Sequence, residues 1–263
     1  MGRIGAVFVL SIVSLSAAPQ EATPAFEVAA IKRDVSGQHI RFTKPFPTLH
    51  IEGSTLKDLI LLAYHVQDFE VTGGPAWIDS DLYDIDAKAD RPPTASPQFA
   101  NLQWRRLQTL LHDRFNLAIH RETKMLPVYE LTVAKGGLKV QPATCTQRIT
   151  GDTNIAPDKK QSDYCGPAAS GRGRIEASGA GMAFLADMLS NQLSRPVVDK
   201  TGIPGDFQIH LAYVPDAPTV SSTADLGPDI FTAIQVQLGL KLQPAKGPVE
   251  VLVIDHVERP TEN

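Results

Sequence analysis

Apolar residues recur at helical spacing in four stretches of the chain. The stretches begin after Ser54, after Asn101, at about Gly181 and after Asp229, and all four residue types favour the N-cap position of a helix. The apolar stripe of the first stretch consists of Leu56, Leu59, Ile60, Ala63 and Tyr64. Each predicted helix is short, so we expect it to be stable only when it packs against a sheet.

Alternation of apolar and polar residues predicts strands between these helices. The segments 82–89 (LYDIDAKA) and 207–213 (FQIHLAY) alternate cleanly, which is typical of strands with one buried face. The segment 249–254 is apolar on both faces, which favours a place in the middle of a sheet. The other predicted strands are 26–33, 39–44 and 128–133.

The two halves of the chain repeat one pattern. Equivalent positions 124 residues apart are Ile51 and Ile175, Tyr83 and Phe207, and Ile85 and Ile209. Asn116 and Gly239 follow the second helix of each half, and both residue types tolerate the left-handed conformation that closes a helix. The first helix of each half needs a slip of two residues to align. We therefore infer an internal duplication; chance agreement of common short patterns is the alternative.

The duplication predicts an α+β fold of two similar β-α-β-β-α-β-β units, with antiparallel or mixed sheets backed by helices. The polar segment between the units is the natural boundary. The predicted parts are a signal peptide (1–18), a first unit (26–140), a disulfide-closed loop (141–173), a second unit (174–258) and a tail (259–263).

The N-terminus predicts export. Arg3 precedes an uncharged run from Ile4 to Ala18, which is short for a membrane span and suitable for the apolar region of a secretory signal. An uncleaved anchor is the alternative, since Pro19 is awkward next to the small residues that a peptidase prefers. No later segment has the length of a spanning helix. We expect a periplasmic or secreted protein with no membrane span once the signal is removed.

Cys145 and Cys165 are the two cysteines of the chain, and they flank a mostly polar stretch. In an oxidising compartment they most simply form a disulfide, which would contribute about 3 kcal/mol by closing a loop of this length. Two free thiols, one of them reactive, are the alternative. Nothing in the sequence pairs either cysteine with a histidine.

The charge balance argues against a polyanionic partner. The chain has 25 basic and 29 acidic side chains, and removing residues 1–18 removes Arg3 and no acid, which leaves 24 against 29 and a net charge of −5. Nucleic acid and anionic lipid are therefore poor partners.

No catalytic, cofactor or metal motif emerges from the residues. The seven histidines include no HExxH sequence. Ser54 and Ser178 precede helices, where capping explains them, and the outward carboxylates Asp84 and Asp86 follow from strand alternation, although they can also be viewed as an acid/base pair. We therefore predict no catalytic residues, no cofactor and no metal site, and whether the protein is an enzyme stays open, with the balance against it.

The segment 71–81 (VTGGPAWIDSD) is the best sequence candidate for a recognition surface. Gly73, Gly74 and Pro75 predict a turn that presents Trp77. An exposed tryptophan on a loop often contacts a partner. The equal alternative is that Trp77 folds back and covers the edge of a sheet.

Five segments of the chain resemble one known family: "FEVAAIKR", "GGPAWIDSDLYDIDAKAD", "LLHDRFNLAIHRETKMLPVYELTVAKGG", "RPVVDKTGI" and "QLGLKLQPAKGPVEVLVIDHVERPTEN". Together they are similar to the large paralogous family of exported acidobacterial (Solibacter-type) proteins of unknown function. The resemblance spans nearly the whole chain after the signal. It implies a periplasmic or secreted product with no assigned activity, and similar domains attached to antibiotic-sensing membrane metallopeptidases imply a sensor or binding part. Residues 229–256 also resemble the short N-terminal domain of secretins and TonB-dependent receptors.

The chain departs from the family pattern in one strand. Ala212 and Tyr213 stand where the family pattern has an acid followed by tryptophan, so any ligand contact made by that pair would be lost here. The family supplies no catalytic residues to transfer.

These observations favour a non-catalytic binding or sensing module of the cell envelope, whose ligand or protein partner is unknown. A hydrolase with a site between the two units is one alternative. A component of an envelope assembly, joined through an exposed strand edge, is the other.

Overall fold

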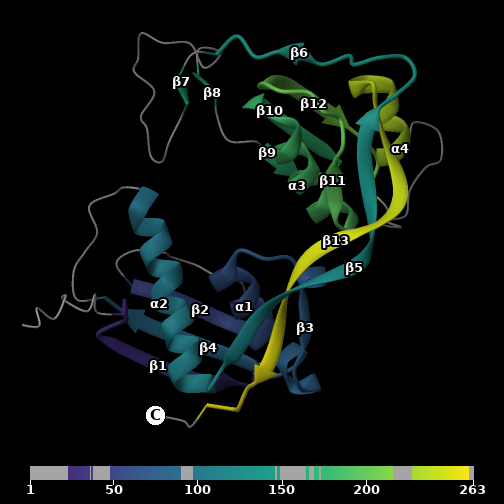
Figure 1. The fold of residues 1–263 in the computed structure, drawn as a ribbon. Helices are drawn as coiled ribbons and strands as arrows, with labels where there is room; N and C mark the ends of the chain where they lie inside the picture. Colours follow the sequence, from purple (N-terminus) through teal and green to yellow (C-terminus); the bar gives the residue numbers. More distant parts are fainter. Residues whose placement is uncertain are drawn as a thin grey trace, which may run out of the picture.

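The computed structural model describes residues 23–35, 37, 48–89, 97–145, 147–148, 164–165, 169–171, 173–215 and 227–260. These residues form two lobes joined by a long two-stranded ribbon (Figure 1). The predicted signal peptide (1–18), the predicted strand 39–44 and most of the turn-rich connections lie outside the described residues. In the part of the chain that the structure describes, no helix has both the length and the apolar composition needed to cross a membrane.

The first half of the chain forms one α+β unit. Its elements in order are β1 (Val28–Asp34), β2 (Thr48–Thr55), α1 (Leu56–Tyr64), η1 (Asp68–Glu70), β3 (Val71–Gly73), η2 (Ala76–Asp79), β4 (Leu82–Lys88), α2 (Pro97–Phe115) and β5 (Ala118–Val133). Strands β1, β4 and β2 form an antiparallel sheet in that order. A core cluster of buried apolar side chains brings this sheet together with α1 and α2.

The second half repeats the order. Its elements are β6 (Gln141–Pro142), β7 (Gln147–Arg148), β8 (Tyr164–Cys165), β9 (Ala169–Gly171), β10 (Arg174–Ala180), α3 (Met182–Leu193), β11 (Val197–Asp199), β12 (Phe207–Ala212), α4 (Ile230–Ala233), η4 (Ile234–Leu238) and β13 (Leu240–His256). Strands β6, β12, β10 and β9 form the second antiparallel sheet. The α+β fold class and the two similar units are confirmed.

Strand pairing corrects the alignment of the two halves. In the first half, Ile51 of β2 pairs with Ile85 of β4. In the second half, the residue equivalent to Ile85 is Ile209 of β12, and it pairs with Ala177 of β10. Ile51 therefore corresponds to Ala177 and not to Ile175. The step is therefore 126 residues for β2 and β10, the same as for helices α1 and α3. The likeness of "IEGS" and "IEAS" is shifted by two residues from the structural equivalence.

The last strands of the two units pair with each other along their whole length. β5 and β13 are antiparallel and form the long ribbon of Figure 1. The pairing begins with Leu240 opposite Val133 and ends with His256 opposite Ala118. Two strands were expected at the end of each unit, and each pair is one continuous strand. β13 lies inside the sheet β11-β5-β13-β3, as predicted for its apolar segment 249–254.

Each lobe is completed by a strand from the other half of the chain. β3 pairs in parallel with β13 of the second half, and β11 pairs in parallel with β5 of the first half. Leu252 and Ile254 of β13 consequently belong to the core of the first lobe, and Leu131 of β5 belongs to the core of the second. The predicted units 26–140 and 174–258 describe the sequence repeat, whereas each hydrophobic core draws on both repeats.

Four of the six helix starts and ends that the sequence indicated agree with the structure, at Gly181, Asp229, Asn116 and Gly239. Asn116 and Gly239 have φ of 52° and 69° and end the second helix of each half, as predicted. Asp229 caps α4 through bonds from the backbone N–H groups of Phe231 and Thr232. Helix α2 begins at Pro97 and not after Asn101, because proline is well suited to the first helical position.

Candidate functional site

A cavity of about 260 Å³ lies between the start of α1 and the segment that follows this helix. It is formed by the end of β2, the first two turns of α1, η1 and η2. Its lining residues are Gly53, Thr55, Lys57, Asp58, Leu61, Asp68 and Asp79.

A bulge at the end of β2 gives the cavity its floor. The pairing of β2 with β4 shifts between Ile51 and Ser54, and Gly53 takes a φ of 57° inside this bulge. The backbone N–H of Gly53 donates to a carboxylate oxygen of Asp84 at 2.9 Å, so Asp84 holds the bulge in place.

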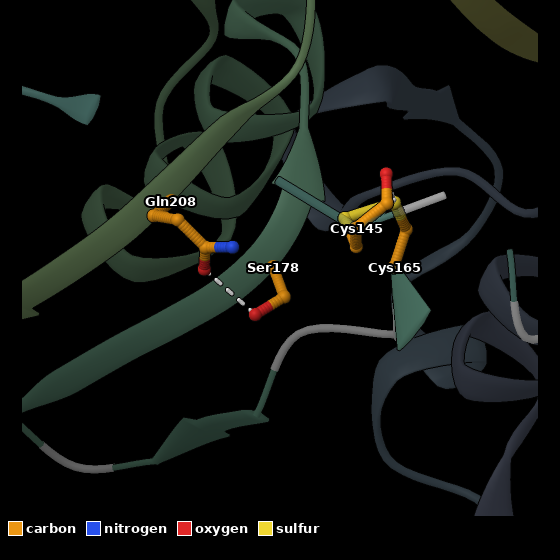
Figure 2. The surroundings of a disulfide bond; sticks show 4 residues. All are labelled: Cys145, Cys165, Ser178 and Gln208. Atoms are coloured by element: carbon orange, nitrogen blue, oxygen red, sulfur yellow. Dashed lines mark hydrogen bonds between the residues drawn. A yellow bond between two sulfur atoms is a disulfide. The ribbon is translucent and has the colours of Figure 1, made fainter. Parts of the chain in front are cut away.

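Thr55, and not Ser54, caps helix α1. Its hydroxyl accepts from the backbone N–H of Asp58 at 3.1 Å, while the Asp58 carboxylate accepts from the backbone N–H of Thr55 at 3.2 Å. This reciprocal capping box fixes the first turn, and the bulge is the reason the cap falls one residue later than predicted. Ser178 does not cap α3 either, because its hydroxyl donates to Gln208 at 2.7 Å (Figure 2). The N-cap of α3 is Gly181.

Lys57 is the central charge of the cavity. Its ammonium nitrogen lies 2.6 Å from Asp68 and 3.4 Å from Asp79, and its side chain is 22% exposed. Burial lowers the pKa of Lys57, but the bonds to Asp68 and Asp79 outweigh burial, so the pKa is raised and the side chain stays charged. The lining contains one ammonium, that of Lys57, and the carboxylates of Asp58, Asp68 and Asp79, so its formal charge is negative.

Sequence reasoning missed this arrangement, although the chain contains a signal for it. A lysine in the first turn of a helix faces the positive end of the helix dipole, which is unfavourable without compensating carboxylates. Lys57 has that position, and its partners lie 11 and 22 residues later. The T-x-x-D sequence from Thr55 to Asp58 also marks the capping box.

The solvent face of the first sheet contains a histidine held between two carboxylates. His50 Nδ1 lies 2.5 Å from Asp86, and its Nε2 lies 2.9 Å from Glu52. The hydrogen bond with Asp86, followed by that with Glu52, raises the pKa of His50. The sequence also allowed Asp84 and Asp86 as an acid/base pair. In the structure, Asp84 accepts from the backbone of the β2 bulge, and Asp86 is hydrogen-bonded to the imidazole of His50.

Trp77 lies on η2, two residues before Asp79 of the cavity. Gly73 and Gly74 have positive φ and turn the chain ahead of it, as predicted. The indole is half-buried against the core of the first lobe, and the guanidinium of Arg259 lies 4.9 Å from its ring centroid. Trp77 thus folds back onto the lobe with part of its surface exposed, and its contact with a partner stays a prediction.

Cys145 and Cys165 form the predicted disulfide (Figure 2). It packs against Gly179 of β10, where an added Cβ would lie 2.6 Å from Cys165 Sγ and 2.8 Å from Cys145 Sγ.

Tyr213, at the position where the chain departs from the family pattern, is buried and donates its hydroxyl to Gln192 at 2.7 Å.

Three other histidines lie on the surface beside carboxylates. His112 lies beside Asp113, His120 beside Asp255 and His256 beside Glu258, each at 2.9 Å. Within the described ranges, no group of three or more His, Cys, Asp or Glu side chains is placed to hold a metal ion.

Comparison with known proteins places the chain in a family. A family model described as a protein of unknown function (DUF3738) matches residues 57–257, which include most of the cavity lining, the disulfide and both ribbon strands. No curated protein and no solved structure matches the chain. Because the match extends over most of its length, the chain belongs to the DUF3738 family.

Proposed function

We propose that this DUF3738 protein is an exported protein of the cell envelope, periplasmic or secreted, that binds a ligand or partner without catalysing a reaction. The observation that carries the proposal is the cavity at the start of α1, beside the turn that bears Trp77. Export is supported by the uncharged run behind Arg3 and by the disulfide, since disulfides persist in oxidising compartments.

The charges of the cavity indicate the class of ligand. Asp68 and Asp79 have side chains that are 72% and 56% exposed, so a ligand can reach both carboxylates. Lys57 neutralises only part of their charge, and Leu61 supplies an apolar wall. A ligand with an ammonium or guanidinium group on a short apolar stem fits this lining.

The binding proposal is tested by amide NMR titration with n-butylamine and with n-butanol as the neutral counterpart. We expect saturable shifts at residues 53–61 and 68–79 with the amine only. Asp68→Asn together with Asp79→Asn should lower the affinity for the amine about tenfold or more, since each charge-assisted hydrogen bond contributes about 1.5–3 kcal/mol.

Asp113→Asn is the matched control, because Asp113 is also an exposed aspartate paired with a cationic or ionisable side chain. Equal shifts with the amine and the alcohol, or no saturable shift with the amine, would contradict the proposal. Export is tested separately by cell fractionation and by N-terminal sequencing of the mature protein, which we expect to begin shortly after Ala18.

A further inference from the structure

Three side chains from separate elements stack on the surface of the second lobe. The guanidinium carbon of Arg195, which follows α3, lies 4.3 Å from the ring centroid of Tyr129 on β5. The Tyr129 ring meets the ring of Phe231 on α4 edge-on, with centroids 5.4 Å apart. The backbone N–H of Tyr129 donates to the carbonyl of Pro196 at 2.8 Å, which holds Arg195 over the ring.

Arg195 differs from other arginines of the structure in its electrostatic surroundings. Arg33 and Arg259 share Asp81, and Arg174 pairs with Glu176. Among the residues that the structure describes, no carboxylate lies within 4 Å of the Arg195 guanidinium, and its buried Nε–H has no acceptor. Buried donors without an acceptor are uncommon. This buried Nε–H is out of reach of a ligand, so a carboxylate would pair with the terminal nitrogens of the guanidinium, the side chain best suited to bind it.

The duplication shows that this stack is not required for packing. In the second lobe, Arg195 lies two residues before Val197, and Val197 pairs with Tyr129. In the first lobe, Phe69 lies two residues before Val71, and Val71 pairs with Leu252. At the positions equivalent to Arg195 and Tyr129, the first lobe has Phe69 and Leu252, which are both apolar. The shared fold therefore does not need a cation at this position.

We propose that Arg195, Tyr129 and Phe231 form a binding site for a carboxylate attached to an apolar or aromatic group. The guanidinium pairs with the carboxylate, and Tyr129 fixes the plane of the guanidinium by stacking. Phe231 is 37% exposed, so its free surface packs against the apolar part of the ligand. This site is independent of the amine-binding cavity in the first lobe.

The test is a calorimetric and NMR titration of the purified protein with phenylacetate and with its neutral counterpart phenylacetamide. We expect saturable binding of phenylacetate, with shifts of the Arg195 Nε–H signal and of the Tyr129 and Phe231 amides. A second arm uses a tripeptide that ends in phenylalanine, with a free or an amidated C-terminus, and distinguishes a chain terminus from a small organic acid as the preferred source of the carboxylate.

Arg195→Gln should weaken phenylacetate binding about tenfold or more, since a hydrogen bond to a charged group contributes about 1.5–3 kcal/mol. Arg195→Lys should recover only part of the loss, because an ammonium cannot bind a carboxylate in bidentate fashion. Phe231→Ala should also weaken binding. The matched controls in the same lobe are Arg174→Gln and Phe184→Ala, the latter removing a phenylalanine that is 38% exposed.

Binding of the carboxylate and the amide with equal affinity overturns the proposal, and so does the absence of saturable binding in both arms. This comparison uses the unmodified protein, so it does not depend on whether any variant folds. Weakening by the two control variants as large as that by the Arg195 and Phe231 variants also overturns it.

Discussion

Gly53 and Gly179 occupy equivalent places in the two repeats and have different surroundings. Both lie in a bulge two residues before the N-cap of a helix, with φ of 57° and 75°. Gly53 borders the cavity of the first lobe, whereas Gly179 lies directly under the Cys145–Cys165 disulfide. The disulfide thus covers in the second lobe the glycine whose equivalent lines a cavity in the first.

Gly179→Ala should destabilise the protein by about 2–4 kcal/mol. A positive φ costs an alanine about 1–2 kcal/mol, and the new methyl group overlaps the disulfide, which adds the penalty of overpacking. Urea denaturation measures the loss. Gly53→Ala is the matched control and should show mainly the cost of its positive φ.

Releasing the disulfide separates the two contributions to the effect of Gly179→Ala. In a background with Cys145→Ser and Cys165→Ser, the penalty of Gly179→Ala should fall toward that of Gly53→Ala, because the segment is free to move away. A penalty of the same size in both backgrounds would show that the disulfide does not press on Gly179. The double serine variant alone should lose about 3 kcal/mol, as expected for a loop of this length.

The sequence was informative where the signal was local. The apolar stripes of the helices and the left-handed closures at Asn116 and Gly239 depend on residues within one or two turns, so they could be predicted. The cap at Thr55 was missed because a positive-φ glycine in the bulge adds a residue before the helix. The predicted strand 128–133 is longer in the structure: β5 begins at Ala118 and continues through Pro127, whose missing N–H faces away from β13.

The tertiary arrangement was not predictable from these patterns. Alternation shows that 249–254 is a buried strand, but it does not show that β3 of the other half is its neighbour. The cavity depends in the same way on where the chain returns after α1, since Lys57 meets Asp68 and Asp79 only in the folded lobe.

Leu252→Ala should destabilise the first lobe, although Leu252 belongs to the second repeat. Its side chain is almost fully buried in the core of the first lobe, and such truncations cost about 2–5 kcal/mol. Trp77 and Trp104, the two tryptophans of the protein, both pack against that core, so tryptophan fluorescence reports on it. Leu189→Ala in the core of the second lobe is the control and should shift the fluorescence transition less. An unchanged fluorescence transition in Leu252→Ala would rule out the exchanged core.

The stability contributed by His50 should decrease as the pH rises. Asp86 and Glu52 raise the pKa of His50 in the folded protein above the ordinary value of 6.5. Its contribution is therefore complete below pH 6.5 and is lost as the pH increases through the raised pKa. The site is largely exposed, so the contribution stays below about 1 kcal/mol. The test measures the free energy of unfolding of the wild type and of His50→Gln from pH 5 to pH 9. The difference between the two should shrink as the pH rises. A difference that grows contradicts the ion-pair assignment.

Asp81 should anchor the C-terminal segment to the first lobe. Its carboxylate is 10% exposed and accepts from Arg33 at 3.0 Å and from Arg259 at 2.8 Å. Asp81→Asn should cost about 2 kcal/mol, since hydrogen bonds to charged groups contribute about 1.5–3 kcal/mol. Arg259→Met should in addition shift the emission of Trp77 to longer wavelength, because the guanidinium no longer covers the indole. Arg121→Met, in the exposed pair with Glu250, is the control and should leave the emission unchanged.

The prolines of the ribbon should protect its open edges from pairing with another molecule. The N–H of Tyr129 points away from β13, toward the carbonyl of Pro196. Because backbone N–H groups alternate in direction along a strand, every second residue of β5 counted from Tyr129 has its nitrogen on the outer edge of the ribbon. The residues opposite them on β13 also have their nitrogens on an outer edge. Pro127, Pro244 and Pro248 all fall on this set, opposite Lys246, Tyr129 and Met125. Each therefore removes a donor from an edge that a foreign strand would otherwise use.

Pro127→Thr combined with Pro248→Thr restores two outward N–H groups on the ribbon without removing a bond between β5 and β13. We expect the variant to self-associate as its concentration increases, with a rise in molar mass by light scattering, while Pro204→Thr in a surface loop behaves as the wild type. A monodisperse double variant with the wild-type mass would show that the prolines do not guard the edge. Self-association would instead show that the native ribbon is shielded, which argues against an envelope assembly built by strand addition at its middle.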